Sequence, residues 1–277
     1  MAEGYAFRVE PGANVRLADH DPGTRAGLSR TEGTARLSAL LEELDKLQQQ
    51  LYGAGRNAVL LILQGLDSSG KDGAIRKVIS GMSPQGVLIR SFKAPTEEEL
   101  AHDFLWRIHR VVPRLGMLAV FNRSHYEDVL VPRVHELVPR AVWHARYAYI
   151  NNFEELLSAS GTIIVKCYLH ISRKEQEERL LAREADVNKA WKLSADDWRE
   201  REHWADYQAA YEAALSACST SFAPWYIVPA DHKWFRDLAL ADVLVRTLRT
   251  YSPEWREALE QMARERLPQV RAVRGAT

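Results

Sequence analysis

Residues 58–73 read Ala-Val-Leu-Leu-Ile-Leu-Gln-Gly-Leu-Asp-Ser-Ser-Gly-Lys-Asp-Gly, and this stretch decides the fold. Its first six residues are all apolar, which is typical of a strand buried on both faces of a parallel sheet. Residues 65–71 then form a G-x4-G-K pattern, and helix-compatible residues follow it. A strand before this pattern and a helix after it are the context that a phosphate-binding loop, or P-loop, requires.

The chemistry of phosphate explains the residue types in this loop. Glycines let the backbone curl so that successive N–H groups point at phosphate oxygens. The N-terminal end of the following helix adds positive partial charge, and Lys71 adds a full charge. The predicted phosphate-binding residues of the loop are Gly65, Ser68, Ser69, Gly70, Asp72 and Gly73.

One loop position departs from the common pattern. Asp72 follows the lysine, where Ser or Thr would usually bind Mg²⁺. Another group must then hold the metal, and Asp67 is the obvious candidate because Mg²⁺ prefers carboxylate oxygens together with substrate phosphates. We therefore predict metal or catalytic use of Asp67, while a loop-shaping role stays open.

Further apolar runs follow along the chain, and amphipathic helical stretches lie between them. These runs cover Val87–Ile89, Met117–Phe121, Thr162–Leu169 and Trp225–Val228. Strands that alternate with helices predict an α/β fold in three layers, with a parallel central sheet and helices on both faces.

The chain divides into three predicted parts. Residues 1–30 lack periodicity and are expected to form an extended arm. Residues 31–255 are expected to form the P-loop domain. Within it, residues 173–217 are charged, helical and too long for a plain crossover, so we predict a helical lid that closes over phosphates. Residues 256–277 are expected to form a C-terminal helix and tail.

Polar residues follow the Met117–Phe121 strand. Asn122 stands where P-loop enzymes that use ATP usually have Asp, and it can orient a metal-bound water without adding charge. Arg123 is set to reach a transferring phosphoryl group, since its planar fork pairs two oxygens at once. Glu127 and Asp128 either supply the missing carboxylate or only favour the dipole of the next helix; both readings stay open.

The composition indicates an ordinary soluble enzyme, with 46% apolar and 27% charged residues. Lysine plus arginine equal aspartate plus glutamate at 37 each, which argues against a general nucleic-acid binder. Between Trp106 and Arg146, however, there are seven arginines and only three acids, and this local excess of positive charge favours an anionic substrate.

We interpret Cys167 and Cys218 as core thiols. We expect a cytoplasmic protein that does not enter a membrane, because no apolar run approaches about 20 residues and no secretory signal begins the chain.

Four strings of residues form a specific combination: residues 65–73, Ser91-Phe-Lys-Ala-Pro-Thr96, Phe121-Asn-Arg-Ser-His-Tyr-Glu-Asp128 and Trp191-Lys-Leu-Ser194. Taken together, they resemble the polyphosphate kinase 2 family. The resemblance covers roughly residues 15–255 and rests on the combination of motifs, since the P-loop alone would not be specific. A single P-loop indicates the single-domain form of the family.

The resemblance implies a thymidylate-kinase-like fold with a helical lid, and Mg²⁺-dependent transfer of a terminal phosphate between polyphosphate and a nucleotide. Matching the motifs assigns catalytic roles to Asp67, Lys71, Asn122, Arg123 and Arg183, with Asp67 and Asn122 on the metal. Many members carry Asp where this chain has Asn122. That departure resembles the subclass that phosphorylates both AMP and ADP, so AMP, ADP and ATP are the expected nucleotides. We also expect a homo-oligomer, although the sequence does not give its size.

Polyphosphate is a linear polyanion, so a basic track should lead away from the P-loop. Candidates are Arg76 and Lys77 after the loop, and Arg179, Arg183, Lys189 and Lys192 in the predicted lid. Neighbouring acids dilute the charge of the lid, so the alternative that these residues only form a solvated helical face stays open.

The chief rival function is a nucleotide kinase that uses ATP as donor. The missing Ser or Thr after Lys71 and the missing Asp at position 122 count against it.

Overall fold

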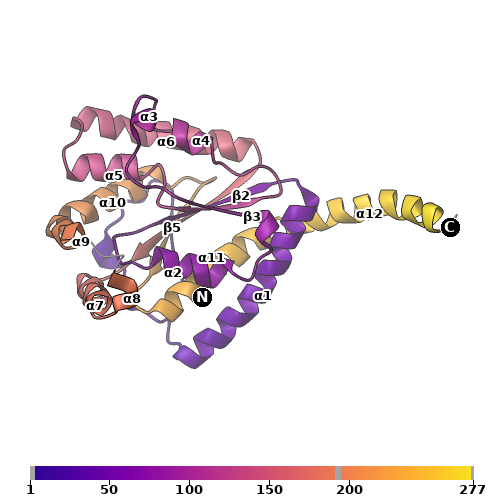
Figure 1. Ribbon diagram of the computed structural model, residues 1–277, viewed down its shortest axis with the longest axis horizontal. Helices are drawn as coiled ribbons and strands as arrows, with labels where there is room; N and C mark the ends of the chain where they lie inside the picture. Colours follow the sequence, from indigo (N-terminus) through magenta and orange to yellow (C-terminus); the bar gives the residue numbers. More distant parts are fainter. Residues whose placement is uncertain (1–3, 191–194, 276–277) are drawn as a thin grey trace.

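The computed structural model describes residues 4–190 and 195–275. Its centre is a six-stranded sheet with the strand order β1-β6-β5-β2-β4-β3 (Figure 1). The strands are β1 (Phe7–Val9), β2 (Ala58–Gln64), β3 (Val87–Ser91), β4 (Leu118–Asn122), β5 (Thr162–His170) and β6 (Trp225–Pro229).

The five strands expected from the sequence are all present, and they pair with one another in parallel. The sheet also contains a sixth strand that the sequence did not reveal. The N-terminal arm contributes β1, which runs antiparallel to β6 and pairs Phe7 with Ile227 and Val9 with Trp225. A strand of three residues is too short to show an alternating pattern, so only the structure could place it.

Helices cover both faces of the sheet, and short helical turns connect them. The longer helices are α1 (Arg30–Ala54), α2 (Lys71–Ile79), α5 (Glu127–Val134), α6 (Arg140–Ala159), α7 (Arg173–Glu184), α10 (Trp204–Cys218), α11 (Lys233–Arg249) and α12 (Ser252–Gly275). The shorter ones are α3 (Glu97–Leu100), α4 (Trp106–His109), α8 (Val187–Ala190), α9 (Ala195–Arg199), η1 (Leu17–Asp19), η2 (Pro84–Gly86) and η3 (Glu200–His203).

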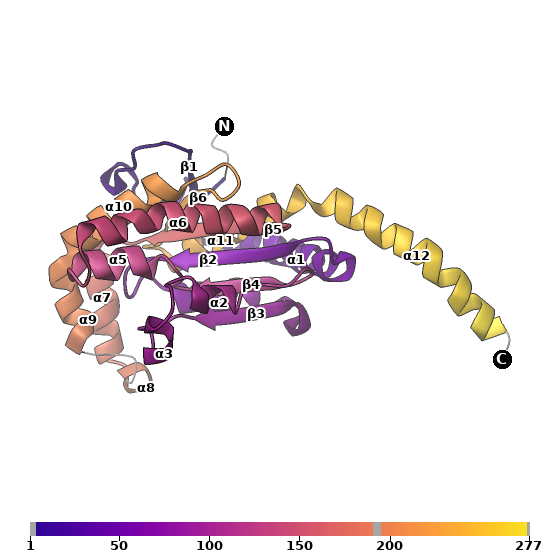
Figure 2. The same cartoon turned by 90° about the horizontal axis from the view of Figure 1, so that it is seen from above.

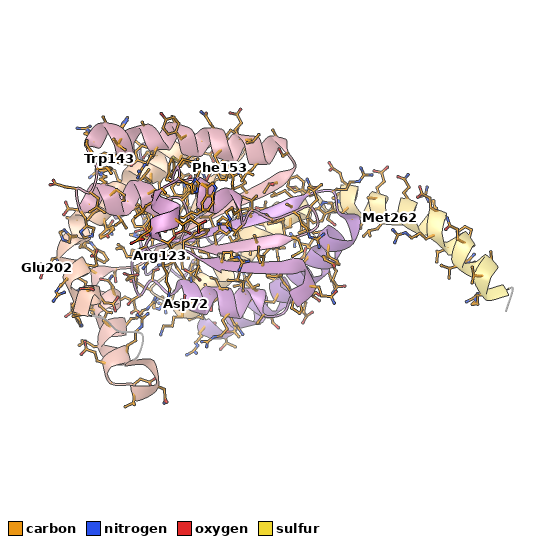
Figure 3. All side chains as sticks on the ribbon, turned by 45° about the horizontal axis from the view of Figure 1, so that its top comes forward. Asp72, Arg123, Trp143, Phe153, Glu202 and Met262 are labelled. Carbon is orange, nitrogen blue, oxygen red and sulfur yellow. The ribbon has the colours of Figure 1, made fainter. Side chains whose placement is uncertain are left out.

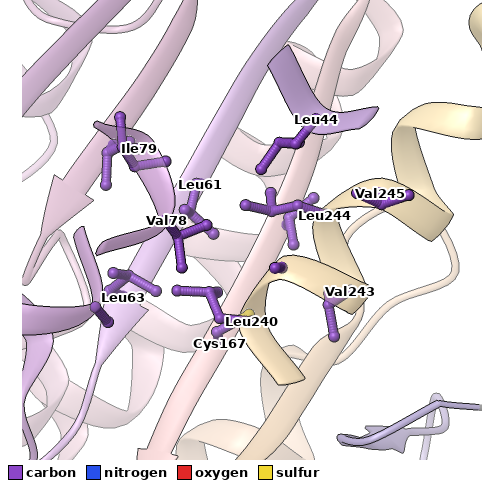
Figure 4. Packing of buried hydrophobic residues seen from close by; sticks show 14 of the residues in the cluster. Leu44, Leu61, Leu63, Val78, Ile79, Cys167, Leu240, Val243, Leu244 and Val245 are labelled. Carbon is purple, nitrogen blue, oxygen red and sulfur yellow. The ribbon is translucent and has the colours of Figure 1, made fainter. Parts of the chain in front are cut away.

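Alternate residues of the central strand feed two apolar cores. Leu61 and Leu63 of β2 point to one face, where α1, α2 and α11 pack against the sheet (Figure 4). Leu60 and Ile62 point to the other face, which is covered by α5, α6 and α10. Since successive side chains of a strand alternate between faces, the uninterrupted apolar run of β2 is what a strand between two helical layers needs. The expected three-layer architecture is confirmed.

The connections after β2 and β4 leave the sheet on opposite faces. β2 leads to α2 on one side, whereas β4 leads to α5 on the other. The two strands are neighbours, and Leu63 pairs with Asn122 at their carboxyl ends. Ligands of open α/β sheets bind at such a divergence of connections. The fold therefore places the P-loop beside the residues that follow β4.

The helices beyond the sheet lie at two opposite ends of the molecule. α7, α8 and α9 lie at the end where β2 points, whereas α12 extends away from the body at the other end (Figures 1 and 2). Within the predicted lid, α10 buries Ala210, Tyr211 and Leu215 in the second core. The lid boundaries stay a prediction, but the last helix of residues 173–217 packs as part of the body. No helix in the described ranges combines the length and the apolarity that crossing a membrane requires.

Candidate active site

The backbone of the P-loop is left-handed at three positions. φ is +151° at Gly65, +65° at Ser68 and +100° at Gly70. A Cβ on Gly65 would lie 2.8 Å from the backbone oxygen of Leu169, so no larger residue fits there. Ser68 has a Cβ and adopts this conformation against its intrinsic preference. Such strain persists only where surrounding contacts hold it, and it is concentrated at functional sites.

Two hydroxyl groups of the loop lack protein partners. The side-chain oxygens of Ser68 and Ser69 are buried, and neither has a hydrogen-bond partner within the described part of the chain. Buried polar groups are nearly always hydrogen-bonded in folded proteins, so an exception calls for an explanation. A phosphate ligand in the loop would supply acceptors for these hydroxyls.

Lys71 begins α2 and folds back over the loop that precedes it. Its ammonium group donates to the backbone oxygens of Gly65 and Leu66 at 2.6 and 3.3 Å. Burial lowers the pKa of Lys71, and the nearby charge of Asp67 partly offsets that effect. The loop therefore carries a positive charge held by backbone dipoles at its centre.

Asp67, Arg123 and Glu127 form a charged cluster beside this lysine. Arg123 donates to the Asp67 carboxylate at 2.6 Å and lies 3.6 Å from the carboxylate of Glu127. Its backbone N–H donates to Leu63, which ties the end of β4 to the end of β2. φ of Arg123 is +63°, a second non-glycine residue in the left-handed region at this site. The expected proximity of Asp67, Lys71 and Arg123 is therefore present.

The pKa values of the two carboxyl groups move in opposite directions. Burial acts to raise the pKa of Asp67, but the positive charges of Lys71 and Arg123 outweigh it and lower that pKa. In Glu127, burial prevails over the same two cations and raises the pKa. Asp67 is thus held as a carboxylate, whereas Glu127 takes up a proton more readily than an ordinary glutamate. Groups with pKa values shifted apart in this way are frequent at functional sites.

Asn122 and Asp72 meet across the mouth of the loop. The Asn122 amide donates to the Asp72 carboxylate at 2.7 Å. Figure 3 shows Asp72 and Arg123 at the same end of the sheet, far from Met262 on α12. Asp72 was expected to depart from the usual Ser or Thr role in metal binding. Its contact with Asn122 places Asp72 next to the position at the end of β4 where P-loop enzymes that use ATP usually have an aspartate.

The oxygen atoms at this end of the sheet fit a magnesium ion that is bound mainly by its substrate. No group of three or more His, Cys, Asp or Glu side chains in residues 4–190 and 195–275 is arranged to hold a metal. Mg²⁺ usually takes only one or two protein carboxylates and completes its octahedron with water and phosphate oxygens. Asp67 and the Asn122–Asp72 pair offer such a sparse set beside the loop.

Helix α7 lies directly against the P-loop. Arg183 lies on this helix, and its positive charge is a minor cause of the lowered pKa of Asp67. Arg179 was a candidate for the basic track, but its guanidinium is buried and bonds to the backbone oxygens of Ser68 and Ser69. It is therefore directed at the back of the loop and is not exposed for a polyanion.

Four candidates of the basic track remain, and the structure describes the side chains of two of them. Arg76 and Lys77 are exposed on α2. Lys77 lies near Asp237 of α11. Burial raises the pKa of Asp237, and the positive charge of Lys77 opposes part of that rise. Lys192 lies outside the described residues, as does the side chain of Lys189. The phosphate-binding roles of these four residues stay predictions.

Several arginines of residues 106–146 contact neighbouring side chains of the same segment. Arg107 pairs with Asp128 at 3.2 Å, and the guanidinium groups of Arg110 and Arg133 lie over Trp106 and Trp143. Arg123 is the arginine of this segment that reaches the P-loop cluster described above. His125 is fully buried and packs against Phe153. Cys167 and Cys218 are confirmed as buried thiols.

Two contributors, Gln176 and Arg236, escaped the sequence analysis, and Arg179 was expected to bind polyphosphate and not the loop. Gln176 and Arg179 bond to the loop from α7, and Arg236 of α11 packs against Gly70. Gln176, Arg179 and Arg183 stand at spacings of three and four on one helix, so the sequence did indicate a shared face. Nothing in the sequence pointed that face at the loop, and Arg236 gave no signal at all.

Comparison with known proteins identifies relatives over most of the chain. Residues 27–256 match the family described as Polyphosphate kinase 2 (PPK2). The chain is 47% identical to an AMP/ADP-polyphosphate phosphotransferase of Meiothermus ruber, over 87% of this chain and 91% of that protein. It is 46% identical to an ADP-polyphosphate phosphotransferase of Rhodopseudomonas palustris, over 83% and 84% of the two chains.

A solved structure shares the fold. The crystal structure of a polyphosphate kinase 2 from Arthrobacter aurescens TC1 superimposes with a TM-score of 0.84 at 44% sequence identity. The match covers 87% of this chain and 88% of that one.

Proposed function

The chain belongs to the polyphosphate kinase 2 family, and we propose that it transfers the terminal phosphate of inorganic polyphosphate to AMP and to ADP, giving ADP and ATP, in a reversible reaction. The observation that carries this proposal is the strand-end pair Asn122–Arg123 against a complete P-loop. Arg123 touches Asp67 of the loop, and Asn122 touches Asp72. The two relatives compared above are named for different acceptors at nearly equal identity, so overall identity does not decide between AMP and ADP.

The transfer needs charge stabilisation more than it needs acid–base chemistry. A phosphate oxygen of the acceptor attacks the terminal phosphorus of polyphosphate, and the bond to the next bridging oxygen breaks. The shortened chain leaves with that electron pair. The attacking oxygen is already ionised near neutral pH, so no base has to remove a proton. The residues then have to align two polyanions and stabilise charge that develops between them.

Lys71, Arg123 and Arg183 supply that positive charge from three different elements. Lys71 stands at the start of α2, Arg123 follows β4, and Arg183 belongs to α7. Asp67 holds the guanidinium of Arg123 by a hydrogen bond of 2.6 Å, which fixes one arm of its fork beside the loop. A pre-oriented cation costs little reorganisation when charge develops in the transition state.

Mg²⁺ is the proposed cofactor, held by Asp67 and by the oxygen of Asn122. Such an ion would supply positive charge that offsets the charge of the phosphate oxygens during transfer. The lowered pKa of Asp67 supports this assignment, since a metal-binding carboxyl group must be ionised. Cytoplasmic location and homo-oligomeric assembly stay predictions from the sequence.

Asn122 is the proposed determinant of the acceptor range. Transfer to AMP and transfer to ADP place the accepting oxygen one phosphate apart, so one substrate must shift by a unit while the reacting atoms stay aligned. A neutral side chain at position 122 repels an additional acceptor phosphate less than an aspartate would. Asp72, which Asn122 contacts, already brings one negative charge there.

A time course with the purified enzyme tests the proposal. With polyphosphate, Mg²⁺ and AMP, we expect ADP to form first and ATP to follow, without added ATP. If ADP is consumed in a parallel reaction while AMP stays untouched, the dual-acceptor proposal is wrong. In Asn122→Asp we expect the rate with one acceptor to fall several-fold more than the rate with the other. An equal loss with both acceptors would mean that Asn122 does not set the range.

A further inference from the structure

Two side chains of α7 hold three successive backbone carbonyls of the P-loop. The Gln176 amide donates to the oxygen of Asp67 at 2.9 Å. One terminal nitrogen of Arg179 donates to the oxygen of Ser68 at 3.0 Å and to that of Ser69 at 2.8 Å. All three carbonyls of the loop therefore face α7.

Every N–H group of the Arg179 guanidinium has an acceptor. Its second terminal nitrogen donates to the oxygens of Ala230 and Asp231 at 2.6 and 2.9 Å, in the connection between β6 and α11. Its Nε donates to Glu175 at 2.7 Å. An arginine has five N–H donors in a fixed plane, and here all five are used while the residue is only 7% exposed. A lysine could not reproduce this geometry, since it has three donors on one atom.

Holding the carbonyls fixes the direction of the N–H groups on the opposite side. In a trans peptide, the oxygen of one residue and the N–H of the next point in opposite directions. Carbonyls of Asp67 and Ser69 that face α7 therefore turn the N–H groups of Ser68 and Gly70 away from it, toward the inside of the loop. The N–H of Ser69 closes a turn onto Leu66 at 3.0 Å.

The same contacts bracket the strained residue of the loop. Ser68, with φ of +65°, has its preceding carbonyl bonded to Gln176 and its own carbonyl bonded to Arg179. A left-handed non-glycine residue costs of order 1–3 kcal/mol and persists where its surroundings over-determine it. The two side chains of α7 supply that determination.

We propose that Gln176 and Arg179 are positioning residues that set the conformation of the P-loop and couple it to α7, the helix that carries Arg183. This inference rests on the proposed function for the identity of the ligand, a polyphosphate. Helix α7, the first helix of the predicted lid, then shapes the P-loop in addition to covering the substrate. The loop is shaped for phosphate only while α7 is docked, and Arg183 arrives with the same helix.

The test compares two variants with a matched control, using inorganic tripolyphosphate as the probe. Arg179→Lys keeps the charge but loses the fork, and Gln176→Met keeps the volume but loses one bond. Arg201→Lys is the control, because Arg201 is also buried and bonds to Glu177 of α7 at 2.8 Å, away from the loop. For each protein, the dissociation constant of tripolyphosphate, kcat and KM, and the melting temperature with and without tripolyphosphate are measured.

We expect Arg179→Lys to weaken tripolyphosphate binding by about tenfold and to lower kcat by about 10- to 100-fold, since misplacing a site by about 1 Å can cost 100-fold. The thermal stabilisation by tripolyphosphate should shrink accordingly. Gln176→Met should show the same pattern, about threefold in each quantity, because it removes a single hydrogen bond. Arg201→Lys should lower the melting temperature of the free protein yet bind and turn over within about twofold of the unchanged protein.

The inference is overturned if Arg179→Lys behaves like Arg201→Lys, with reduced stability but unchanged binding and kcat. If Arg179→Lys does not fold, Gln176→Met decides by the same criterion. An unchanged protein that binds tripolyphosphate but transfers no phosphate would contradict the proposed function and leave the binding comparison valid. A protein that binds no tripolyphosphate at all would contradict both.

Discussion

Lys71 and Lys166 are both buried lysines beside the central sheet, yet their surroundings differ. Lys166 of β5 donates to the carboxylate of Glu154, to the hydroxyl of Tyr126 at 2.9 Å and to the backbone oxygen of Cys218 at 2.6 Å. Its three donors have three acceptors, one of them a full negative charge. Lys71 bonds to two backbone oxygens, and no carboxylate forms an ion pair with it in the part of the chain that the structure describes.

The difference separates a lysine held in an ion pair from the lysine for which we propose a role in phosphate transfer. Glu154 is completely buried, and although burial acts to raise its pKa, Lys166 and His125 outweigh it and lower that pKa. The two opposite charges of this pair therefore cancel, and no net charge remains to attract a ligand. Backbone dipoles hold Lys71 without cancelling its charge, so its charge remains for an anion. Four substitutions test this contrast, and the one with the largest expected effect comes first.

Lys166→Met should destabilise the protein without reducing the activity of the molecules that fold. Removing one partner leaves Glu154 as an uncompensated buried charge, which costs about 3–5 kcal/mol. For a protein of this size the melting temperature should fall by roughly 6–20 °C. Adding Glu154→Met should recover part of that loss. A Lys166→Met protein with normal stability but poor kcat would place Lys166 among the functional residues.

Lys71→Ala should show the reverse, a near-complete loss of transfer with the fold intact. Contacts that stabilise developing phosphoryl charge are worth about 100- to 1,000-fold in rate, or about 3–4 kcal/mol. The rate of ATP formation from ADP and polyphosphate is compared with the melting temperature of the same sample. More than about a tenth of the original rate would contradict the role of Lys71 in stabilising the phosphoryl group.

Asp67→Asn should reduce the rate by about 100-fold, in line with the loss of one preorganised group, and should change the dependence on Mg²⁺. The variant loses the charge that both orients Arg123 and is proposed to hold the metal. Rates are measured across a Mg²⁺ titration, with Asp206→Asn of α10, an exposed carboxylate, as the matched control. A normal titration at a normal rate would remove Asp67 from the metal site.

Glu127→Gln should give the smallest effect, a pH-dependent gain in stability. Burial raises the pKa of Glu127, so the folded state binds its proton more tightly than the unfolded state does. Ionisation above the unfolded pKa of about 4.3 therefore destabilises the fold, increasingly until the pH passes the folded pKa. The melting temperature of Glu127→Gln, relative to the unchanged protein, should be higher by a few degrees at pH 8, and this difference should shrink toward pH 4. The opposite trend would mean that the ion pair with Arg123 dominates.

Much of this fold follows from local patterns in the sequence. The five apolar runs became five parallel strands, because a strand between two helical layers needs apolar residues on both faces. Helix α1 is followed by Gly55, which adopts the left-handed conformation that commonly closes a helix. β1 was missed, since three residues of an arm pair only after β6 has formed its edge.

The active site was predictable where chemistry lies within one motif and unpredictable where it lies between elements. Asp67, Lys71 and Arg123 were expected from short strings, and the structure brings them together. Other contacts depend on how α2, β4 and α7 pack together. These are the hydrogen bond between Asn122 and Asp72 and the hydrogen bonds from Arg179 to the loop. The excess of arginines between residues 106 and 146 did not indicate which of them reaches the P-loop, since Arg107 pairs with an acid and Arg110 and Arg133 lie over tryptophan rings.

The most direct test of the account compares two donors for the same acceptor. Purified protein is given AMP and Mg²⁺ with either polyphosphate or ATP as the sole donor, and formation of ADP is followed. The account predicts fast ADP formation with polyphosphate and little with ATP. Rapid phosphorylation of AMP by ATP, with polyphosphate inactive, would contradict it and identify an ATP-dependent nucleotide kinase on this fold.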